Sequence, residues 1–169
     1  MRQYTSFRRV ATTLLLAGAL IPLTSAARTG DRDLPLEASA SYSRYSESEQ
    51  TQLLRDDVVI TQGSLKLTAA ELLIHLDKGR ATRLSASGSP VTFEQLNDAG
   101  QRVSGYADAL DYHSETGRLE LTGNAHLDAP NQTLDADHII YNISSHEASA
   151  KGGDSGRVNL VIQPAESDQ

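Results

Sequence analysis

The side chains that could perform acid–base or metal chemistry are spread thinly along this sequence. The histidines lie far apart, at His75, His113, His126, His138 and His146. The densest group is "DADH", where a strand would place Asp135 and Asp137 on one face and His138 on the other. No nucleophile has an adjacent base in the sequence, although distant groups could still meet in the fold. The sequence therefore predicts no metal, no cofactor and no enzymatic activity.

Two aspartates instead mark the same position of an internal repeat. Counting from Asp108 or from Asp137, apolar residues recur at +2, +4, +11 and +13, and a glycine follows at +15. The first copy holds Leu110, Tyr112, Leu119, Leu121 and Gly123; the second holds Ile139, Tyr141, Ala148, Ala150 and Gly152. A third copy starts at Glu71 with Leu73, His75 and, after a two-residue insertion, Leu84, Ala86 and Gly88; a faint one starts at Ser41 with Tyr45, Leu54 and Asp56. Such a period predicts stacked units of supersecondary structure, with the aspartates marking a strand rim.

Each copy is interpreted as strand, turn, strand. The apolar positions alternate with period two, and polar turns such as "SETG" (114–117) and "SSHE" (144–147) separate them. The glycine at +15 is typical of a corner or bulge, where the backbone bends. Only "TAAELLIHL" (68–76) could be argued as a helix, and its neighbours are strand-like. The sequence predicts a single all-β domain over residues 27–163, followed by a disordered tail over 164–169.

The first residues have the pattern of a secretory signal peptide. Arg2, Arg8 and Arg9 precede the uncharged apolar run from Val10 to Leu23, and small residues follow. We expect residues 1–26 to be removed by cleavage after Ala26 or Ala27; a retained membrane anchor is the alternative. The chain has no cysteine, so it has neither a disulfide nor a cysteine for lipid attachment.

Composition narrows the possible partners. After cleavage, 12 Lys and Arg face 22 Asp and Glu, a net charge of −10. A chain of this charge does not suit nucleic acid, which needs clustered positive charge. The mature chain has no Trp and a single Phe, Phe93, so it cannot build a dense aromatic core.

A stack of short antiparallel strands has open ends with unpaired backbone groups, and an interior lined by every second residue. Small residues such as Ala86, Ala125, Ala148 and Ala150 would leave room in that interior. A space lined with Leu, Ile, Val and Tyr suits alkyl chains better than a polar substrate. The alternative is that these side chains close on one another as an ordinary core.

Three stretches of the chain resemble, in order, consecutive pieces of the LptA or OstA-like family. They are "DDVVITQGSLKLTAAELLI", "SPVTFEQLNDAGQRVSGYADALDYHSETGRLELTGNAHL" and "ADHIIYNISSHEASAKGG". The likeness covers about Leu34 to Gln163 and is most specific from Pro90 to Leu127; "DD" at 56–57 departs from the Gly-Asn frequent in the family. The resemblance implies a β-jellyroll, a twisted stack of antiparallel strands that forms an open apolar groove.

The resemblance also implies a function. Members are periplasmic proteins of lipopolysaccharide transport that shelter lipid A acyl chains in the groove and stack end to end through their terminal strands. They bridge an LptC-type inner-membrane protein, here expected at the N-terminal edge, and an LptD-type outer-membrane translocon, expected at the C-terminal edge. This sequence has no phosphate-binding glycine loop, so the resemblance implies that an inner-membrane ATPase drives the flow.

Resemblance and alternation together predict the residues that bind lipid and partners. The expected groove residues are Leu36, Phe93, Leu110, Tyr112, Leu119, Leu121, Ile139, Tyr141 and Ile143. The expected edge residues are Leu34, Leu36 and Ala38 near the start, and Val158, Leu160, Val161 and Ile162 in the final run. The inward face around Leu72–Leu76 is left open, because both faces there are apolar apart from His75. Two alternatives remain: a closed adaptor β-domain of the cell envelope that binds no lipid, and a β-sandwich hydrolase acting on periplasmic glycans.

Overall fold

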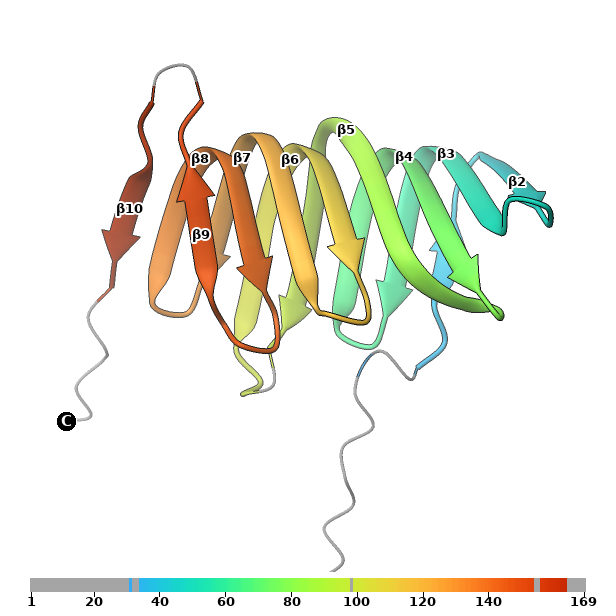
Figure 1. The fold of residues 1–169 in the computed structure, drawn as a ribbon, viewed down its shortest axis with the longest axis horizontal. Helices are drawn as coiled ribbons and strands as arrows, with labels where there is room; N and C mark the ends of the chain where they lie inside the picture. Colours follow the sequence, from blue (N-terminus) through green and yellow to red (C-terminus); the bar gives the residue numbers. More distant parts are fainter. Residues whose placement is uncertain (1–30, 32–33, 98, 154–155, 164–169) are drawn as a thin grey trace, which may run out of the picture.

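The fold is entirely β in a computed structural model that describes residues 31, 34–97, 99–153 and 156–163 (Figure 1). The strands are β1 (Glu37–Ser39), β2 (Tyr42–Ser46), β3 (Thr51–Gln62), β4 (Leu65–Asp77), β5 (Arg80–Leu96), β6 (Arg102–His113), β7 (Arg118–Ala129), β8 (Gln132–Asn142), β9 (Ala148–Lys151) and β10 (Asn159–Ile162). The segment "TAAELLIHL" lies within β4, which confirms its assignment as a strand. Over the described residues, no helix is long and apolar enough to cross a membrane. The predicted signal peptide and tail lie outside the described residues.

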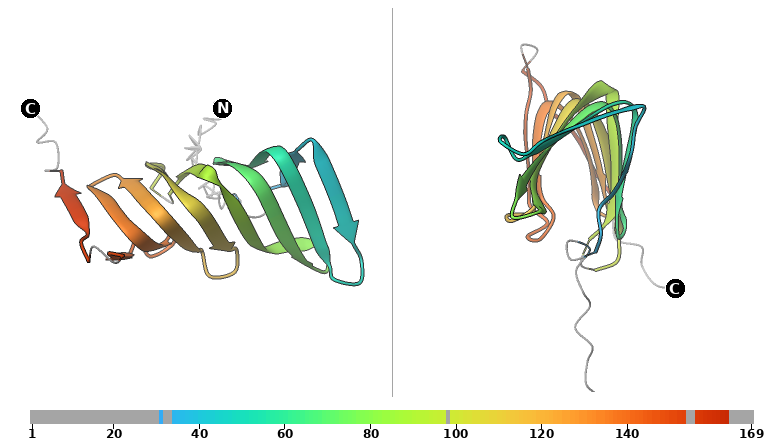
Figure 2. Two further views of the ribbon diagram at one scale, coloured as in Figure 1. Left: turned by 90° about the horizontal axis from the view of Figure 1, so that it is seen from above. Right: turned by 90° about the vertical axis from the view of Figure 1, so that its right-hand side faces the viewer.

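All ten strands belong to one antiparallel sheet. Its order is β1-β3-β4-β5-β6-β7-β8-β10, while β2 also pairs with β3 and β9 also pairs with β8. From β3 to β8, strands that follow one another in the chain are neighbours in the sheet, as short turns between antiparallel strands dictate. Seen from one end, the sheet curves into an arch that is open along one long side (Figure 2). The arrangement confirms the predicted jellyroll of stacked strands.

We call the two sides of the arch the first and the second wall, and its open side the mouth. The first wall contains β2, β9 and the halves of β3 to β8 beside the turns at 47–50, 78–79, 114–117 and 143–147. The second wall contains β1, β10 and the halves beside the turns at 63–64, 97–101 and 130–131. The two rows of turns therefore border the mouth.

Each long strand bends where one wall meets the other. The pairing register shifts there in five successive ladders, between Arg55/Val58, Thr68/Glu71, Ser87/Val91, Tyr106/Ala109 and Thr122/Ala125. Gly123 adopts a left-handed φ of 77°, which glycine adopts without strain. Asp56 and Asp57 take the same region at 59° and 55°, as aspartate tolerates better than most residues. The corner is therefore retained although "DD" at 56–57 departs from the family pattern.

The repeated aspartate and glycine meet at these corners. A Cβ on Gly123 would lie 2.6 Å from Asp108 Oδ2, and one on Gly153 would lie 3.0 Å from Asp137 Cβ. The glycine therefore leaves room for the corner side chain of the preceding strand. In the second copy this glycine is Gly153 rather than Gly152, because a Cβ on Gly152 would meet the Arg157 backbone nitrogen and not Asp137.

The third copy departs from the repeat offsets, and the structure decides the inward face that the sequence left open around Leu72–Leu76. Leu72 and Ile74 point inward and are 0% and 4% exposed, whereas Leu73 and His75 lie on the outer face. The reason is that Ala70, and not Glu71, occupies the corner: a Cβ on Gly88 would lie 3.2 Å from the Ala70 backbone nitrogen. Glu71 instead forms an ion pair with Arg55, with 2.5 Å between Glu71 Oε2 and Arg55 Nε.

The inner faces of both walls pack into one apolar cluster. It includes Leu54, Val58, Ile60, Leu67, Leu72, Ile74, Leu84, Val91, Phe93, Val103, Leu110, Tyr112, Leu119, Leu121, Leu127, Leu134, Ile139, Tyr141 and Ile143. Every one of the strands from β3 to β8 contributes, and within each half-strand the buried residues alternate with exposed or half-buried ones. This cluster holds the two walls against each other along the length of the arch.

Candidate functional site

The interior of the arch contains the groove residues predicted from the sequence. Eight of the nine are buried: Phe93, Leu110, Tyr112, Leu119, Leu121, Ile139, Tyr141 and Ile143. Leu36, which precedes β1, is half-buried and packs against the same cluster. Burial raises the pKa of the Tyr141 hydroxyl, so this side chain stays neutral in the apolar interior.

Side chains from the two walls nearly fill this interior. A narrow cavity of about 10 Å³ remains between Leu65, Leu67, Phe93 and Gln95 of the second wall and Leu84, Leu110, Tyr112 and Leu119 of the first, with Ile143 beside them. A cavity of this size has room for roughly one water-sized probe and none for an acyl chain. An acyl chain can therefore enter only if the walls move apart or side chains change rotamer.

The mouth widens toward the N-terminal end. A hollow of about 770 Å³ lies between the segment Leu34–Leu36 with Gln62 on one side and the turns around Asp77–Thr82 and Ser114–Glu115 on the other. Its lining is mostly polar, but Leu36 and Ala81 in that lining also pack against the apolar cluster of the interior. The carboxylate of Asp31 accepts hydrogen bonds from the Ser64 amide and hydroxyl, which fixes the chain before β1 to the turn between β3 and β4. This arrangement, a polar hollow at the mouth next to an apolar interior, suits an amphipathic ligand.

Both ends of the sheet present strand edges without a further strand in the described structure. At the N-terminal end these edges belong to β1 and β2, and at the C-terminal end to β9 and β10. Predicted edge residues lie there: Ala38 is in β1, and Leu160, Val161 and Ile162 are in β10. The exposed fractions of Leu160 and Ile162 are 50% and 70%, which is high for aliphatic side chains. Leu34 and Val158, at 40% and 39%, lie just outside the strands.

The direction of the backbone groups in β10 follows from one hydrogen bond. The Gln163 amide donates to the Asn131 carbonyl at 3.1 Å, so this amide points toward β8. Because groups alternate along a strand, the N–H and C=O of Val161 also point toward β8, and those of Leu160 and Ile162 point away from it. The free edge of β10 thus offers backbone donors and acceptors at Leu160 and Ile162.

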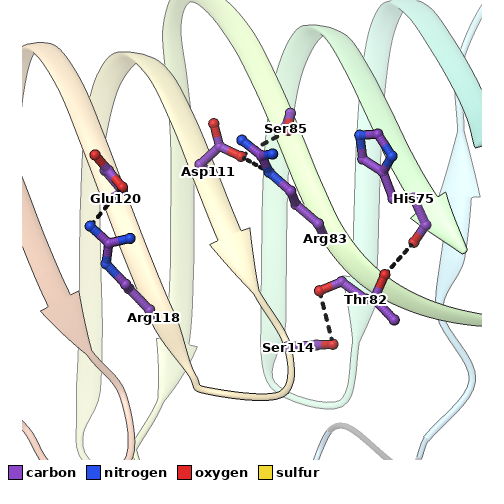
Figure 3. A network of polar contacts seen from close by, with 8 residues as sticks. All are labelled: His75, Thr82, Arg83, Ser85, Asp111, Ser114, Arg118 and Glu120. Carbon is purple, nitrogen blue, oxygen red and sulfur yellow. Dashed lines mark hydrogen bonds and ion pairs between the residues drawn. The ribbon is translucent and has the colours of Figure 1, made fainter. Parts of the chain in front are cut away.

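The outer face of the first wall is joined by polar contacts across neighbouring strands (Figure 3). Arg83 Nε lies 2.6 Å from Asp111 Oδ1, which also accepts a hydrogen bond from the Ser85 hydroxyl. Partial burial alone would raise the pKa of Asp111, but the hydrogen bonds from Arg83 and Ser85 and the Arg83 charge outweigh it and lower that pKa. The same pair raises the pKa of Arg83. These contacts link β5 to β6 without entering the interior.

The histidines and acids do not assemble into a reactive centre in the described part of the chain. His126 Nδ1 lies 2.6 Å from Asp135 on the outside of the second wall, and His138 Nε2 lies 2.6 Å from Glu120 on the outside of the first. The prediction that His138 opposes Asp135 across the strand is wrong, because the corner at Asp137 shifts the alternation and leaves both outside. No group of three or more potential metal ligands occurs among the described residues.

Sequence reasoning missed several interior residues. Val58, Ile60, Leu67 and Leu127 are each at most 2% exposed, although none was singled out. They lie on the second wall, whereas most of the repeat positions used for the prediction lie on the first wall. The alternation of inward and outward residues shifts at the corner between the walls, so the position of each corner is needed to identify them. Gln95 was missed as well, because a polar residue carries no signal for an apolar interior.

The arch, its apolar interior and the strand edges left without a neighbour in the described part of the chain define an open β-jellyroll. The sequence model of the family described as "LptA/(LptD N-terminal domain) LPS transport protein" matches residues 37–147. The chain belongs to this family, which confirms the resemblance and its assignment to transport proteins rather than enzymes.

Individual relatives agree with this assignment. The chain is 26% identical over 162 residues to the lipopolysaccharide export system protein LptA of Escherichia coli K12, covering 94% of this chain and 88% of that protein. It is 29% identical over 160 residues to LptA of Haemophilus influenzae, covering 92% and 93%. The crystal structure of LptH, the LptA-homologous periplasmic component of the lipopolysaccharide transport device of Pseudomonas aeruginosa, superposes with a TM-score of 0.72 at 25% identity, covering 79% of this chain and 99% of LptH.

Proposed function

We propose that this protein carries lipopolysaccharide through the periplasm as one unit of a bridge between the inner and outer membranes. The acyl chains of lipid A lie against the apolar inner faces of the arch, and the ends of the sheet join partner proteins by strand pairing. The observation that carries the proposal is an apolar interior that runs between two sheet ends whose edges have no neighbouring strand among the described residues. Family membership supports it.

The energetics of the interior suit a conduit. Sheltering a methylene group from water is worth roughly 0.8 kcal/mol, so covering eight of them gives about 6 kcal/mol per acyl chain. This stabilisation holds the lipid during transfer and also retains it. Movement therefore needs work from another protein, which the resemblance assigns to an inner-membrane ATPase.

The lipid interacts with residues that already face each other inside the arch. We assign the contacts to Leu36, Phe93, Leu110, Tyr112, Leu119, Leu121, Ile139, Tyr141 and Ile143, which line the interior or pack against it. Because the free cavity is about 10 Å³, binding replaces contacts between the walls with contacts to the acyl chain. The polar head group stays at the mouth.

Each end of the arch provides two edges for a partner. β2 and β9 are the terminal strands of the first wall, and β1 and β10 those of the second. Strand directions in the sheet make a joint of β9 with an incoming β2, and of β10 with an incoming β1, antiparallel.

These edges define the partners. A second copy of the chain pairs end to end, an LptC-type inner-membrane protein pairs with the N-terminal edge around Leu34, Leu36 and Ala38, and an LptD-type translocon pairs with the C-terminal edge around Val158–Ile162. Main-chain hydrogen bonds supply affinity in this mode of recognition, and the side chains beside them supply specificity. The assignment of each membrane partner to its end rests on the resemblance.

Export completes the proposal. The basic, apolar and small-residue segments of residues 1–26 direct the chain to the periplasm and are removed after Ala26 or Ala27. Residues 27–163 then form the single transport domain, and residues 164–169 a disordered tail. Mass spectrometry of the protein isolated from the periplasm tests the cleavage position.

Site-specific photocrosslinking in living cells tests lipid binding. Phe93 is 5% exposed inside the arch, and the adjacent Thr92 is exposed on its outer face. A photoreactive residue at 93 is expected to give an adduct with lipopolysaccharide, and the matched residue at 92 is not. Equal yields at the two positions, or none at 93, would favour the closed adaptor domain that binds no lipid.

A further inference from the structure

Gln95 is a polar residue buried in an otherwise apolar interior. It lies in β5 on the inner face of the second wall and is 8% exposed. Its Oε1 atom is buried and has no hydrogen-bond partner within the described structure. Among the residues that the structure describes, the other two buried polar side chains are both satisfied: Thr51 donates to Glu49, and Asn97 accepts from the amides of Ala99 and Gln101.

The unpaired oxygen belongs to the lining of the interior cavity. Gln95 borders it together with Phe93 and Leu65 of the second wall and Leu110 and Leu119 of the first. Leaving a buried acceptor unsatisfied costs the desolvation of that group, whereas an aliphatic side chain of similar size would cost nothing of this kind. A donor from a bound ligand would satisfy the oxygen and offset the cost.

The position along β5 sets where on the ligand the donor must lie. Gln95 is two residues from Asn97, which begins the turn at the mouth, and so about 7 Å along the strand from it. The corner of β5, near Val91, is further away in the opposite direction. A ligand with its head group at the mouth therefore presents to Gln95 an atom a few bonds from that head group.

We propose that Gln95 is a specificity residue that selects acyl chains carrying a hydroxyl group close to the head group. The hydroxyl donates a hydrogen bond to Gln95 Oε1, and the rest of the acyl chain continues toward the corner along Phe93 and Leu110. This inference rests on the proposed function, because it requires acyl chains in the interior. It adds a polar discrimination to a groove that otherwise recognises alkyl length and shape.

Competition binding with single-chain acids tests the proposal. The mature protein is titrated with 3-hydroxytetradecanoic acid, tetradecanoic acid and 12-hydroxytetradecanoic acid against a fluorescent fatty acid. The comparison is repeated with Gln95→Met, which keeps length and removes the acceptor, and with Leu65→Met, which alters the lining of the same cavity without changing its polarity. A neutral hydrogen bond of ordinary strength predicts that the preference for the 3-hydroxy acid over tetradecanoic acid falls about two- to twelvefold in Gln95→Met. Leu65→Met is expected to keep the preference of the wild type.

Each result decides a different part of the reasoning. The same preference in all three proteins overturns the role of Gln95, and an equal gain for the 12-hydroxy acid overturns its placement near the head group. Failure of every acid to displace the probe from the wild type overturns the lipid groove of the proposed function, and this inference with it. Thermal unfolding of Gln95→Met at or above the wild-type temperature is expected, because the substitution removes an unsatisfied buried oxygen.

Discussion

Replacing Leu160 with proline should block end-to-end association while leaving the protomer folded. The Leu160 amide points away from β8, as the alternation from the Gln163–Asn131 hydrogen bond shows. Proline at this position therefore removes no ladder bond within the protomer. It removes a donor from the free edge and places its ring where an incoming strand must lie.

The expected size of the effect follows from the edge. Loss of one backbone hydrogen bond weakens association by about 0.5–1.5 kcal/mol, or up to roughly tenfold. Exclusion of the incoming strand by the ring adds to this loss, so we expect more than a tenfold weakening. Leu160 is 50% exposed and β10 is four residues long, so unfolding of the protomer should change by less than about 1 kcal/mol.

Sedimentation velocity over a concentration series measures the association, and lipopolysaccharide titration of the same samples measures the groove. Leu160→Ala keeps the amide donor and controls for the lost side chain. Val161→Pro controls for strand geometry, because its amide points toward β8 and the substitution should detach β10 from the sheet. Undiminished oligomers in Leu160→Pro would refute strand pairing at this edge. Loss of lipid binding in the same variant would show that β10 belongs to the groove as well.

Three further perturbations examine the interior, the corners and the outer face. Phe93→Asp places a carboxylate in the apolar cluster, so we expect more than tenfold weaker lipopolysaccharide binding and a lower unfolding temperature. Circular dichroism should still show β-structure. Unchanged affinity would mean that Phe93 does not lie in the groove. Gly123→Ala should lower the free energy of unfolding in urea by about 1 kcal/mol because of its φ of 77°, and further because its Cβ would clash with Asp108. Gly79→Ala is the control: its φ is 79° but the space around it is open, so only the backbone cost of about 1 kcal/mol is expected. Asp111→Asn should lower the free energy of unfolding by about 1 kcal/mol at neutral pH, a modest amount because solvent partly screens the contact with Arg83. Folding lowers the Asp111 pKa, so this stabilisation is present above the unfolded pKa and disappears as the pH falls through the folded pKa. Equal losses of stability at pH 7 and pH 2 would contradict this reasoning.

The sequence pattern identified the first wall well and the second wall poorly. Leu110, Tyr112, Leu119 and Leu121 alternate within half-strands of the first wall, where period-two reasoning holds, and all four are buried as predicted. Period-two reasoning fails across a corner, because each corner shifts the alternation by a residue. Ala107 and Leu110 are both inward although they are three residues apart.

The position of a corner is not evident where its residues are ordinary. Gly123 and the pair Asp56–Asp57 mark their corners through left-handed φ values, which glycine and aspartate make visible in the sequence. β4 has Ala69 and Ala70 at its corner and gives no such signal. Counting from Glu71 as from Asp108 therefore does not identify the inward face of β4, where Leu72 rather than Leu73 is buried. Here the register of β4 against its neighbours decided the face, and that register is a property of the whole sheet.

The nearly full interior and the proposed conduit are compatible because of how the arch is held together. Backbone hydrogen bonds run along each wall from strand to strand, and the walls face each other through apolar side chains of the buried cluster. An acyl chain between the walls replaces one set of apolar contacts with another of similar free energy per methylene, and it leaves the strand ladders intact. The angle between the walls is set at the corners, where the strand ladders are already interrupted. Separation of the walls would therefore cost little hydrogen bonding, so a narrow cavity of about 10 Å³ is compatible with the proposed groove.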